Sequence, residues 1–262
     1  YSRARNLHAA ARRLVAEHGA QLPTTVDALQ ALPGIGRYTA GAIASIAFGK
    51  PAPAVDGNVE RVLSRLLAID AEAGSTAAQR RLWDMAAELA ACDRPGEINQ
   101  ALMDLGATIC TPLTPTCGNC PLRRSCAARA EGDPLRYPRR SPRRVERPTL
   151  RLTFLWYRTR SGVWLERRPL RGLWAGLWQL PGEEGPRSRA RLAQRLGARL
   201  TRRIAGVRHE LSHRIVLASI YTASPTPTLR HRATLRGFAE PLGAPLSAVA
   251  RRAIIAALDA GA

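Results

Sequence analysis

Four of the five cysteines lie close together, at a spacing that is typical of a metal-binding loop. They are separated by six, two and five residues, at Cys110, Cys117, Cys120 and Cys126. Four thiolates in one short segment can surround either a [4Fe–4S] cluster or a tetrahedral zinc ion, and their spacing alone does not separate these two centres. A disulfide framework would distribute its cysteines through a small secreted chain, so we interpret the cluster as a metal site.

A glycine-rich turn over residues 32–41, with the sequence LPGIGRYTAG, is the second candidate site. Gly34 and Gly36 permit backbone conformations that other residues avoid. The amide groups of such a turn, and of the helix that begins near Arg37, can then face a phosphate group. An ordinary connection between two helices is the alternative that a lone Gly-x-Gly turn leaves open.

Asp56, in the segment VDGNVERV over residues 55–62, is the third candidate. An aspartate followed by a helical pattern is commonly an N-cap. A carboxylate held rigidly at a helix entrance can also stabilise positive charge that develops in a transition state. The two roles are compatible.

The charge of the whole chain points to a polyanionic partner. The net charge is +20, and Lys50 is the only lysine among 40 basic residues. The positive groups are therefore almost all guanidiniums, which bind phosphates in a bidentate way. A biased genomic base composition is the alternative explanation of the arginine content.

These candidate residues require helices to position them in the first half of the chain. Apolar spacing and capping residues predict a helix containing Leu7 to Val15, and a short one capped by Thr24 or Thr25. Further helices are predicted over 37–48 before Gly49, from the Asp56 cap to about residue 69, from a Ser75 cap to about residue 91, and from Pro95 towards Cys110. We expect residues 1–130 to form one all-α domain.

The second half has a different pattern. Alternating prolines and arginines over residues 131–149 predict an extended basic linker, which could follow a phosphate backbone or be a solvated tether. Strand-like runs follow at 152–157, 163–166, 204–208 and 215–221, with helical spacing at 187–196 and 246–258. We expect residues 150–262 to form a small α/β domain.

The cysteine spacing, the glycine turn and the aspartate segment occur in an order that resembles the endonuclease III and MutY superfamily of DNA glycosylases. The resemblance implies a helix-hairpin-helix glycosylase domain with a [4Fe–4S] cluster loop over 110–126, in which the cluster is chiefly structural. It implies that Gly34, Gly36 and Arg37 contact DNA and that Asp56 is catalytic. Endonuclease III-like enzymes carry a nucleophilic lysine where this chain has Tyr38, which cannot form a Schiff base. Tyr38 and Asn58 are expected to hydrogen-bond to Asp56, and Gln100 to lie near the adenine pocket.

The second domain resembles the Nudix-like recognition domain of the MutY proteins, through residues 172–182, GLWAGLWQLPG. The helix beyond lacks the Arg-Glu-x2-Glu-Glu pattern that holds magnesium in Nudix hydrolases, so pyrophosphatase activity is not expected. Leu211, Ser212 and His213 match a family loop that inspects 8-oxoguanine, with leucine in place of phenylalanine. Ser212 can accept a hydrogen bond from the N7–H of that base, whereas His209 and His213 could equally be structural.

The resemblance implies a monofunctional base-excision repair enzyme that removes adenine opposite 8-oxoguanine or guanine in double-stranded DNA. The expected protein is a cytoplasmic, nucleoid-associated monomer without a membrane partner. The alternatives are an endonuclease III-like glycosylase/lyase and a non-catalytic iron–sulfur DNA-binding protein. The first residues resemble a segment inside the family's catalytic domain, which places the general-acid glutamate upstream of Tyr1. We therefore expect these 262 residues to bind mispaired DNA but to excise adenine poorly.

Overall fold

The computed structural model describes residues 1–139, 147–160, 162–197, 199–224 and 235–261. The chain divides into two compact units, the first ending at Arg143 and the second beginning at Arg144. Each unit has its own hydrophobic core. In the part of the chain that the structure describes, no helix is both long enough and apolar enough to cross a membrane.

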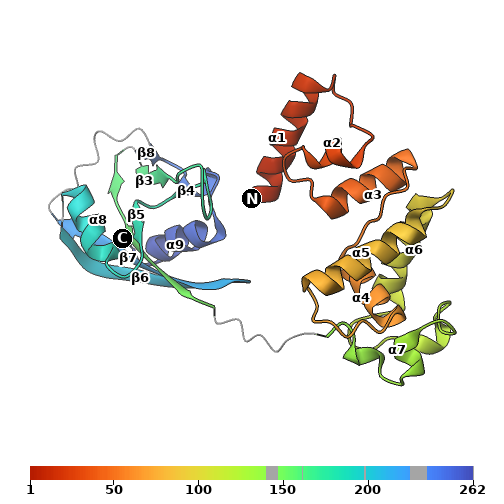
Figure 1. The fold of residues 1–262 in the computed structure, drawn as a ribbon. Coiled ribbons are helices and arrows are strands. Elements are labelled where there is room, and N and C mark those ends of the chain that lie inside the picture. The colour runs from red at the N-terminus through yellow and green to blue at the C-terminus, as the bar shows by residue number, and fades with distance from the viewer. Residues whose placement is uncertain (140–146, 161, 198, 225–234, 262) are drawn as a thin grey trace. The chain divides into compact units, whose positions relative to one another are not determined.

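The first unit is helical throughout its described residues (Figure 1). Its elements are α1 (Ser2–Glu17), α2 (Val26–Gln30), α3 (Arg37–Phe48), α4 (Gly57–Leu66), α5 (Thr76–Ala90), α6 (Pro95–Thr108), the 3-10 turn η1 (Cys117–Asn119), α7 (Ala127–Ala130) and the 3-10 turn η2 (Pro134–Arg136). The expected all-α domain is confirmed.

Capping residues fix where these helices begin. The side chains of Thr25, Asp56 and Ser75 each accept a hydrogen bond from a backbone amide in the first turn that follows. Such caps satisfy amides that have no partner within the helix. Helix α4 ends at Leu66, slightly before the predicted end, because the amide of Ile69 turns back to bond the Ser64 carbonyl at 2.9 Å.

The core of the first unit lies between α4, α5 and α6. Its buried residues include Val59, Leu63, Leu82, Leu102 and Leu105. Helix α1 packs less fully than its apolar spacing predicts. Ala10 is buried, while Leu7 and Val15 of the same apolar pattern are exposed.

The structure shortens the predicted linker, because residues 131–139 belong to the first unit. Tyr137 is buried there, its carbonyl accepts from Arg65 Nε at 3.1 Å, and its hydroxyl donates to Glu131 at 2.8 Å. The carbonyl of Arg139 accepts from the Ala73 amide at 2.8 Å. These bonds hold the segment on α4 and on the turn before α5. Residues 140–146 of the predicted linker lie outside the described residues.

The second unit has two sheets and two principal helices. Its elements are β1 (Thr149–Leu155), β2 (Arg158–Thr159), β3 (Gly162–Arg167), β4 (Trp178–Gln179), β5 (Gly182–Glu184), α8 (Ser188–Leu196), β6 (Arg199–Leu211), β7 (Arg214–Ser224), β8 (Leu235–Phe238), the 3-10 turn η3 (Pro241–Gly243) and α9 (Ala248–Asp259). One sheet has the order β5-β1-β7-β6, with β1 and β7 parallel. In the other, β2, β4 and β8 pair with β3. The expected α/β architecture is confirmed.

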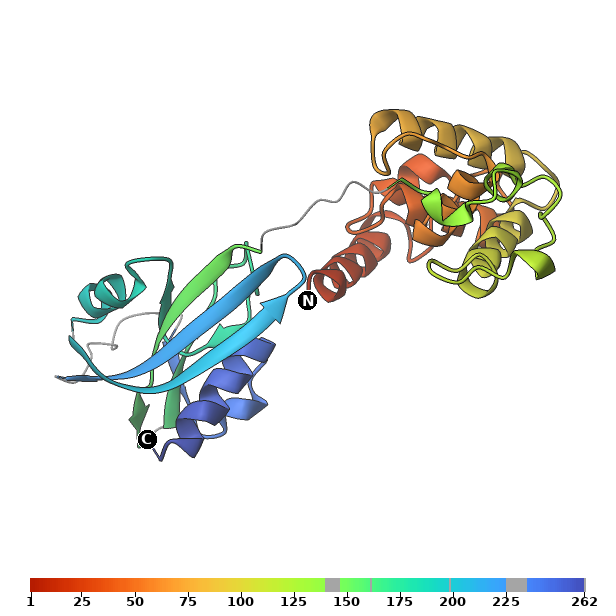
Figure 2. The same ribbon diagram turned by 90° about the horizontal axis from the view of Figure 1, so that it is seen from below.

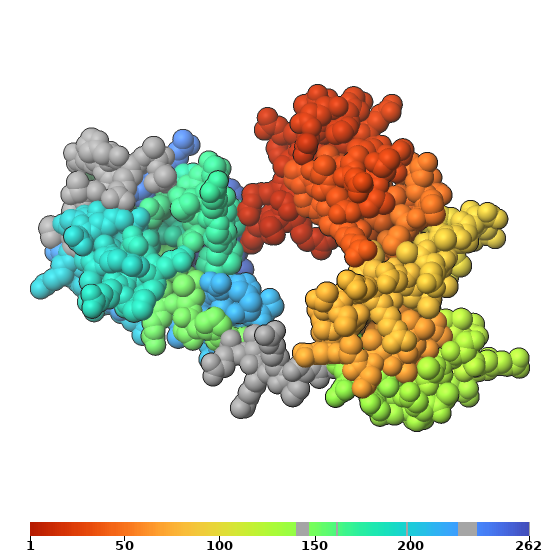
Figure 3. Space-filling model, in the orientation of Figure 1, coloured from red at the N-terminus to blue at the C-terminus, as the bar shows by residue number. Residues whose placement is uncertain are grey.

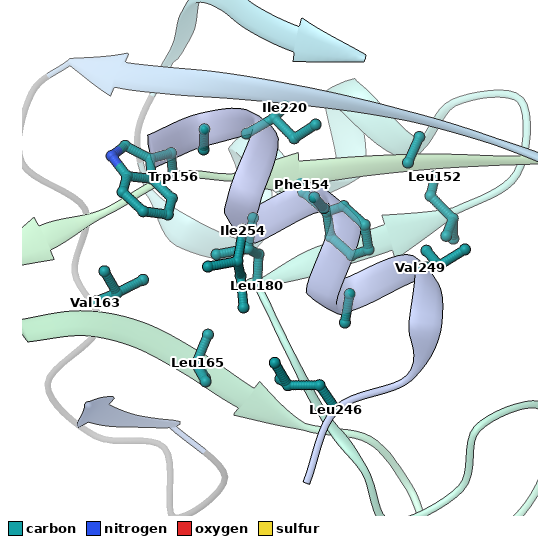
Figure 4. Close-up of a cluster of buried hydrophobic side chains, with 14 of the residues drawn as sticks. Leu152, Phe154, Trp156, Val163, Leu165, Leu180, Ile220, Leu246, Val249 and Ile254 are labelled. Atoms are coloured by element: carbon teal, nitrogen blue, oxygen red, sulfur yellow. The ribbon is translucent and has the colours of Figure 1, made fainter. Parts of the chain in front are cut away.

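Helix α9 packs against the first sheet and towards the second. Phe154 on β1, Leu165 on β3 and Ile254 on α9 belong to one buried cluster, in which their side chains point toward one another (Figure 4). Helix α8 lies on the opposite side of the first sheet (Figure 2), where Leu192 contributes to a second, smaller cluster with Leu155. Each face of this sheet is therefore covered by a different helix.

Candidate functional site

The glycine turn joins α2 to α3. Gly34 has a φ of +82°, and a Cβ at this position would lie 2.6 Å from the Cβ of Asn6 on α1, so both conformation and space require glycine. The expectation that Gly36 needs a special conformation is wrong. Gly36 has an ordinary φ of −89°, because it is the N-cap of α3, and a Cβ there would meet nothing within 4 Å.

The first turn of α3 has the properties of an anion-binding helix end. No side chain caps it, and its first turn holds no acidic residue. The exposed guanidinium of Arg37, the first residue of α3, lies 3.7 Å from the ring centroid of Trp83 on α5. Stacking on an aromatic ring orients a guanidinium and leaves its N–H edge available. Arg37 and the free amides can therefore face the same phosphate group.

Asp56 is held rigidly at the start of α4. One carboxylate oxygen accepts from the backbone amides of Asn58 and Val59, at 2.8 Å each, and the other accepts from Asn58 Nδ2 at 3.2 Å. The residue is half-buried. Three donors fix the carboxylate as an acceptor without neutralising its charge by an ion pair.

Arg61, which the sequence analysis did not single out, positions Asn58. This buried arginine donates to Asn58 Oδ1 at 2.8 Å, to the Gly106 carbonyl at 2.7 Å and to the Cys110 carbonyl at 2.8 Å. The Asn58 amide is thereby oriented with its nitrogen toward Asp56. One guanidinium thus connects the aspartate site with the start of the cysteine loop.

The second expected partner of Asp56, Tyr38, points elsewhere. Tyr38 is exposed near the start of α3, and its hydroxyl lies 3.8 Å from the sulfur of Met103 on α6. Among the hydrogen bonds of the described residues, none joins Tyr38 to Asp56. Of the two residues predicted to hydrogen-bond to Asp56, Asn58 does so, because it lies only two residues further along at the same helix start.

The side chain next to Gln100, Asn99, organises the chain segment that leads to Asp56. Asn99 is buried; its Oδ1 accepts from the Ala54 amide at 3.2 Å, and its Nδ2 donates to the Ala52 carbonyl at 2.9 Å and to Ser45 Oγ at 2.8 Å. Gln100 itself is exposed, and its side-chain amide donates to the Gly96 carbonyl of its own helix at 3.2 Å. Asn99 thus fixes the path from α3 to α4.

The four clustered cysteines all line one small cavity of about 30 Å³ between α4, α7 and the loop that follows α6. None of them forms a disulfide. Burial, with a smaller contribution from the other three cysteines, raises the pKa of the Cys120 thiol. In Figure 3 this loop belongs to the green surface of the first unit.

A buried arginine shapes this loop. Arg65 on α4 is 2% exposed and donates to the carbonyls of Thr111 at 2.8 Å, Pro112 at 3.1 Å and Tyr137 at 3.1 Å. It also lies 3.3 Å from the sulfur of Cys110. A buried charge is stable only when such acceptors surround it. Nothing local in the sequence marks Arg65 for this role, since its partners are 45 to 72 residues away.

The donor set is suited to a thiolate-bound metal centre. Four thiols around one cavity, with an arginine beside one sulfur, provide soft ligands and a positive charge near them. Soft thiolates bind either a zinc ion or an iron–sulfur cluster, so this chemistry is compatible with both centres that the spacing left open.

In the second unit, the residues expected to read a base form the tip of the β6–β7 hairpin. Leu211 pairs with Arg214, and the exposed Ser212 and His213 form the turn between them. Leu211 is half-buried against the core of the unit. Burial, and then the nearby Arg252 on α9, lower the pKa of His209, so it remains neutral at pH 7. That environment is typical of a structural histidine.

The cleft beside α8 contains ion pairs between arginines and glutamates. Arg195 contacts Glu166 at 2.6 Å and Glu183 at 2.9 Å, and Arg168 contacts Glu184 at 2.5 Å. The carboxylates of these three glutamates are therefore partly neutralised by the arginines.

Both units are similar to known families. The model of the helix-hairpin-helix motif matches residues 17–46, and the model of the NUDIX domain matches residues 153–256. A curated adenine DNA glycosylase from Homo sapiens is 54% identical over 130 residues, which is 49% of this chain and 24% of that protein. The adenine DNA glycosylase of Rattus norvegicus is 38% identical over 224 residues, 69% of this chain and 43% of its own length.

Among solved structures, a non-covalent endonuclease III–DNA complex is 28% identical, with a TM-score of 0.41, over 50% of this chain and 59% of that one. The chain spans less than half the length of the human and rat relatives.

Proposed function

We propose, from its similarity to adenine DNA glycosylases, that this chain carries the catalytic aspartate and the recognition domain of a monofunctional base-excision enzyme of the MutY type. The substrate is adenine mispaired with 8-oxoguanine or guanine in double-stranded DNA. The observation that carries the proposal is the Asp56 carboxylate, fixed by three donors at the entrance of α4.

Asp56 performs the electrostatic part of the reaction. When the N-glycosidic bond breaks, positive charge develops on the sugar, and a fixed carboxylate lowers the energy of that state. Asn58 and Arg61 keep the carboxylate in place, while the α3 amides and Arg37 hold the DNA backbone. Water then adds to the sugar carbon from which the base has departed. The adenine is flipped from the duplex before this step, and Gln100 is proposed to line its pocket.

A lyase reaction lacks a nucleophile in this chain. The only lysine, Lys50, follows the C-terminal end of α3, whereas Tyr38 is at the N-terminal end. A helix of 12 residues is about 18 Å long, so Lys50 cannot replace an amine at position 38.

Treatment with alkali separates the proposal from its alternatives. The full-length gene product is incubated with a duplex that contains adenine opposite 8-oxoguanine. A monofunctional glycosylase leaves sites that break only in alkali, a lyase breaks the strand without alkali, and a non-catalytic binding protein does neither.

The four clustered cysteines are proposed to hold a [4Fe–4S] cluster. The cluster, when bound, joins four points of the segment from α6 to α7 and so stabilises this loop. Arg65 holds the backbone of the same loop from the side of α4. No step of base removal requires electron transfer.

Purified anaerobically, the protein is expected to be brown and to contain about four iron and four sulfide ions per chain, because the four thiolates are proposed to hold a [4Fe–4S] cluster. Metal analysis and an assay of acid-labile sulfide check this result. An equimolar amount of zinc without sulfide would contradict the cluster assignment.

Ser212 at the tip of the β6–β7 hairpin is proposed to read the base opposite the adenine. The Ser212→Ala variant is expected to lose about 1–3 kcal/mol of preference for 8-oxoguanine over guanine, because one base-reading hydrogen bond is removed. Single-turnover excision from the two duplexes measures this preference. Equal losses on both would show that Ser212 acts only through the fold.

A further inference from the structure

The sheet β5-β1-β7-β6 has one face that is only partly covered. On β7, Val216 and Ala218 are buried on the side of α9, so Leu217 and Ser219 face the opposite side. The apolar contacts of α8 on that side reach Leu155 and its neighbours. The remainder of the face is an open hollow of about 690 Å³.

Three arginines, Arg151, Arg203 and Arg208, border this hollow around Gly206, Leu217 and Ser219. We call the surface made by these six residues the basic sheet face. The strand register places Arg151, Leu217 and Arg208 in one row across β1, β7 and β6. Two strand spacings separate the two arginines of this row, about 10 Å in all.

The floor beside this row is made of small residues. Ser219 pairs with Gly206 in the next row, and a Cβ at Gly206 would collide with the guanidinium of Arg203. Arg203 therefore lies flat over the sheet instead of extending away from it. A phosphate group above this face could therefore contact the Arg203 guanidinium and the arginines of the neighbouring row.

The charge on this face is only partly compensated by acidic neighbours. No acidic residue lines the hollow. Arg151 and Arg203 are exposed and form no salt bridge with another described residue, while Arg208 pairs with the exposed Glu210 at 2.7 Å. Neighbouring like charges repel each other, so this arrangement is stabilised by an anionic partner.

We propose that the basic sheet face binds phosphate groups of the double-stranded DNA backbone, as a second phosphate-binding surface besides the hairpin of the first unit. The inference rests on the proposed DNA substrate. Guanidiniums bind phosphate oxygens in a bidentate way, and such contacts add affinity without reading sequence.

The test compares two double variants of the intact chain with equal losses of charge. Arg151→Gln/Arg203→Gln alters the basic sheet face. Arg158→Gln/Arg236→Gln removes two exposed arginines of the other sheet and is the matched control. Fluorescence anisotropy with an undamaged 30-base-pair DNA duplex gives the affinity at several salt concentrations, and circular dichroism verifies that each variant is folded.

The face variant is expected to bind DNA about 10 to 100 times more weakly near 0.1 M salt. Its plot of the logarithm of the binding constant against the logarithm of the salt concentration is expected to have a slope smaller in magnitude by about two, because each phosphate contact releases about one counterion. The control is expected to keep the slope of the unmodified chain. Equal slopes for the two variants would overturn the inference, as would an RNA duplex that competes more strongly than DNA. Failure of every form to bind DNA would instead contradict the proposed function.

Discussion

Replacing Asp56 by asparagine in the full-length gene product is expected to slow single-turnover release of adenine by about 10²–10³-fold, the usual effect of removing one group that stabilises charge in a transition state. The carboxylate accepts three hydrogen bonds and lies at a fixed point of α4. Asparagine keeps the shape of the side chain but removes the negative charge.

The same substitution separates catalysis from folding. Asparagine and aspartate are about equally good N-caps, so the midpoint of thermal unfolding should change little. Asp56→Ala should reduce excision similarly and also destabilise the protein by about 0.5–2 kcal/mol, since α4 loses its cap. If Asp56→Asn excised adenine at the unmodified rate, Asp56 would be only a cap.

Replacing Arg65 by leucine is expected to have the largest effect on stability. The carbonyls of Thr111, Pro112 and Tyr137 would lose their donor, and that of the buried Tyr137 would be shut away from water without one. An unsatisfied buried acceptor costs about 1–3 kcal/mol, and the free energy of unfolding should fall by about that amount. Iron content should fall with it, because these carbonyls belong to the segments that carry and follow the cysteines.

Arg124→Leu is the matched control, since this arginine of the same loop is exposed. Chemical denaturation and iron analysis of both variants test the assignment. Full iron content and unchanged stability in Arg65→Leu would show that water or neighbouring groups replace the guanidinium, and that Arg65 does not organise the loop.

Features that depend on neighbours in sequence could be predicted. The caps Thr25, Asp56 and Ser75 could be identified because each bonds to amides within three residues. The stop at Gly49 has the same origin, since its φ of +61° closes α3 locally. The four cysteines share one cavity because one short loop carries them all.

Features that depend on partners far away in the sequence could not be predicted. Arg61, Arg65 and Asn99 are buried polar residues whose main partners lie about 45 or more residues away, and an arginine in a helical pattern is normally expected at the surface. Tyr38 was assigned to Asp56 by resemblance, while its hydroxyl contacts Met103. The two-residue strands β2 and β4 are defined by their pairing with β3, which no local pattern indicates.

The central claim is tested most directly by single-turnover excision from duplexes that differ only in the base opposite one adenine. The full-length gene product is offered 8-oxoguanine, guanine, cytosine or thymine at that position, and alkali reveals the sites formed. The account predicts fast adenine release opposite 8-oxoguanine, slower release opposite guanine, and none opposite thymine. Release at one rate opposite all four bases, or strand breakage without alkali, would contradict it.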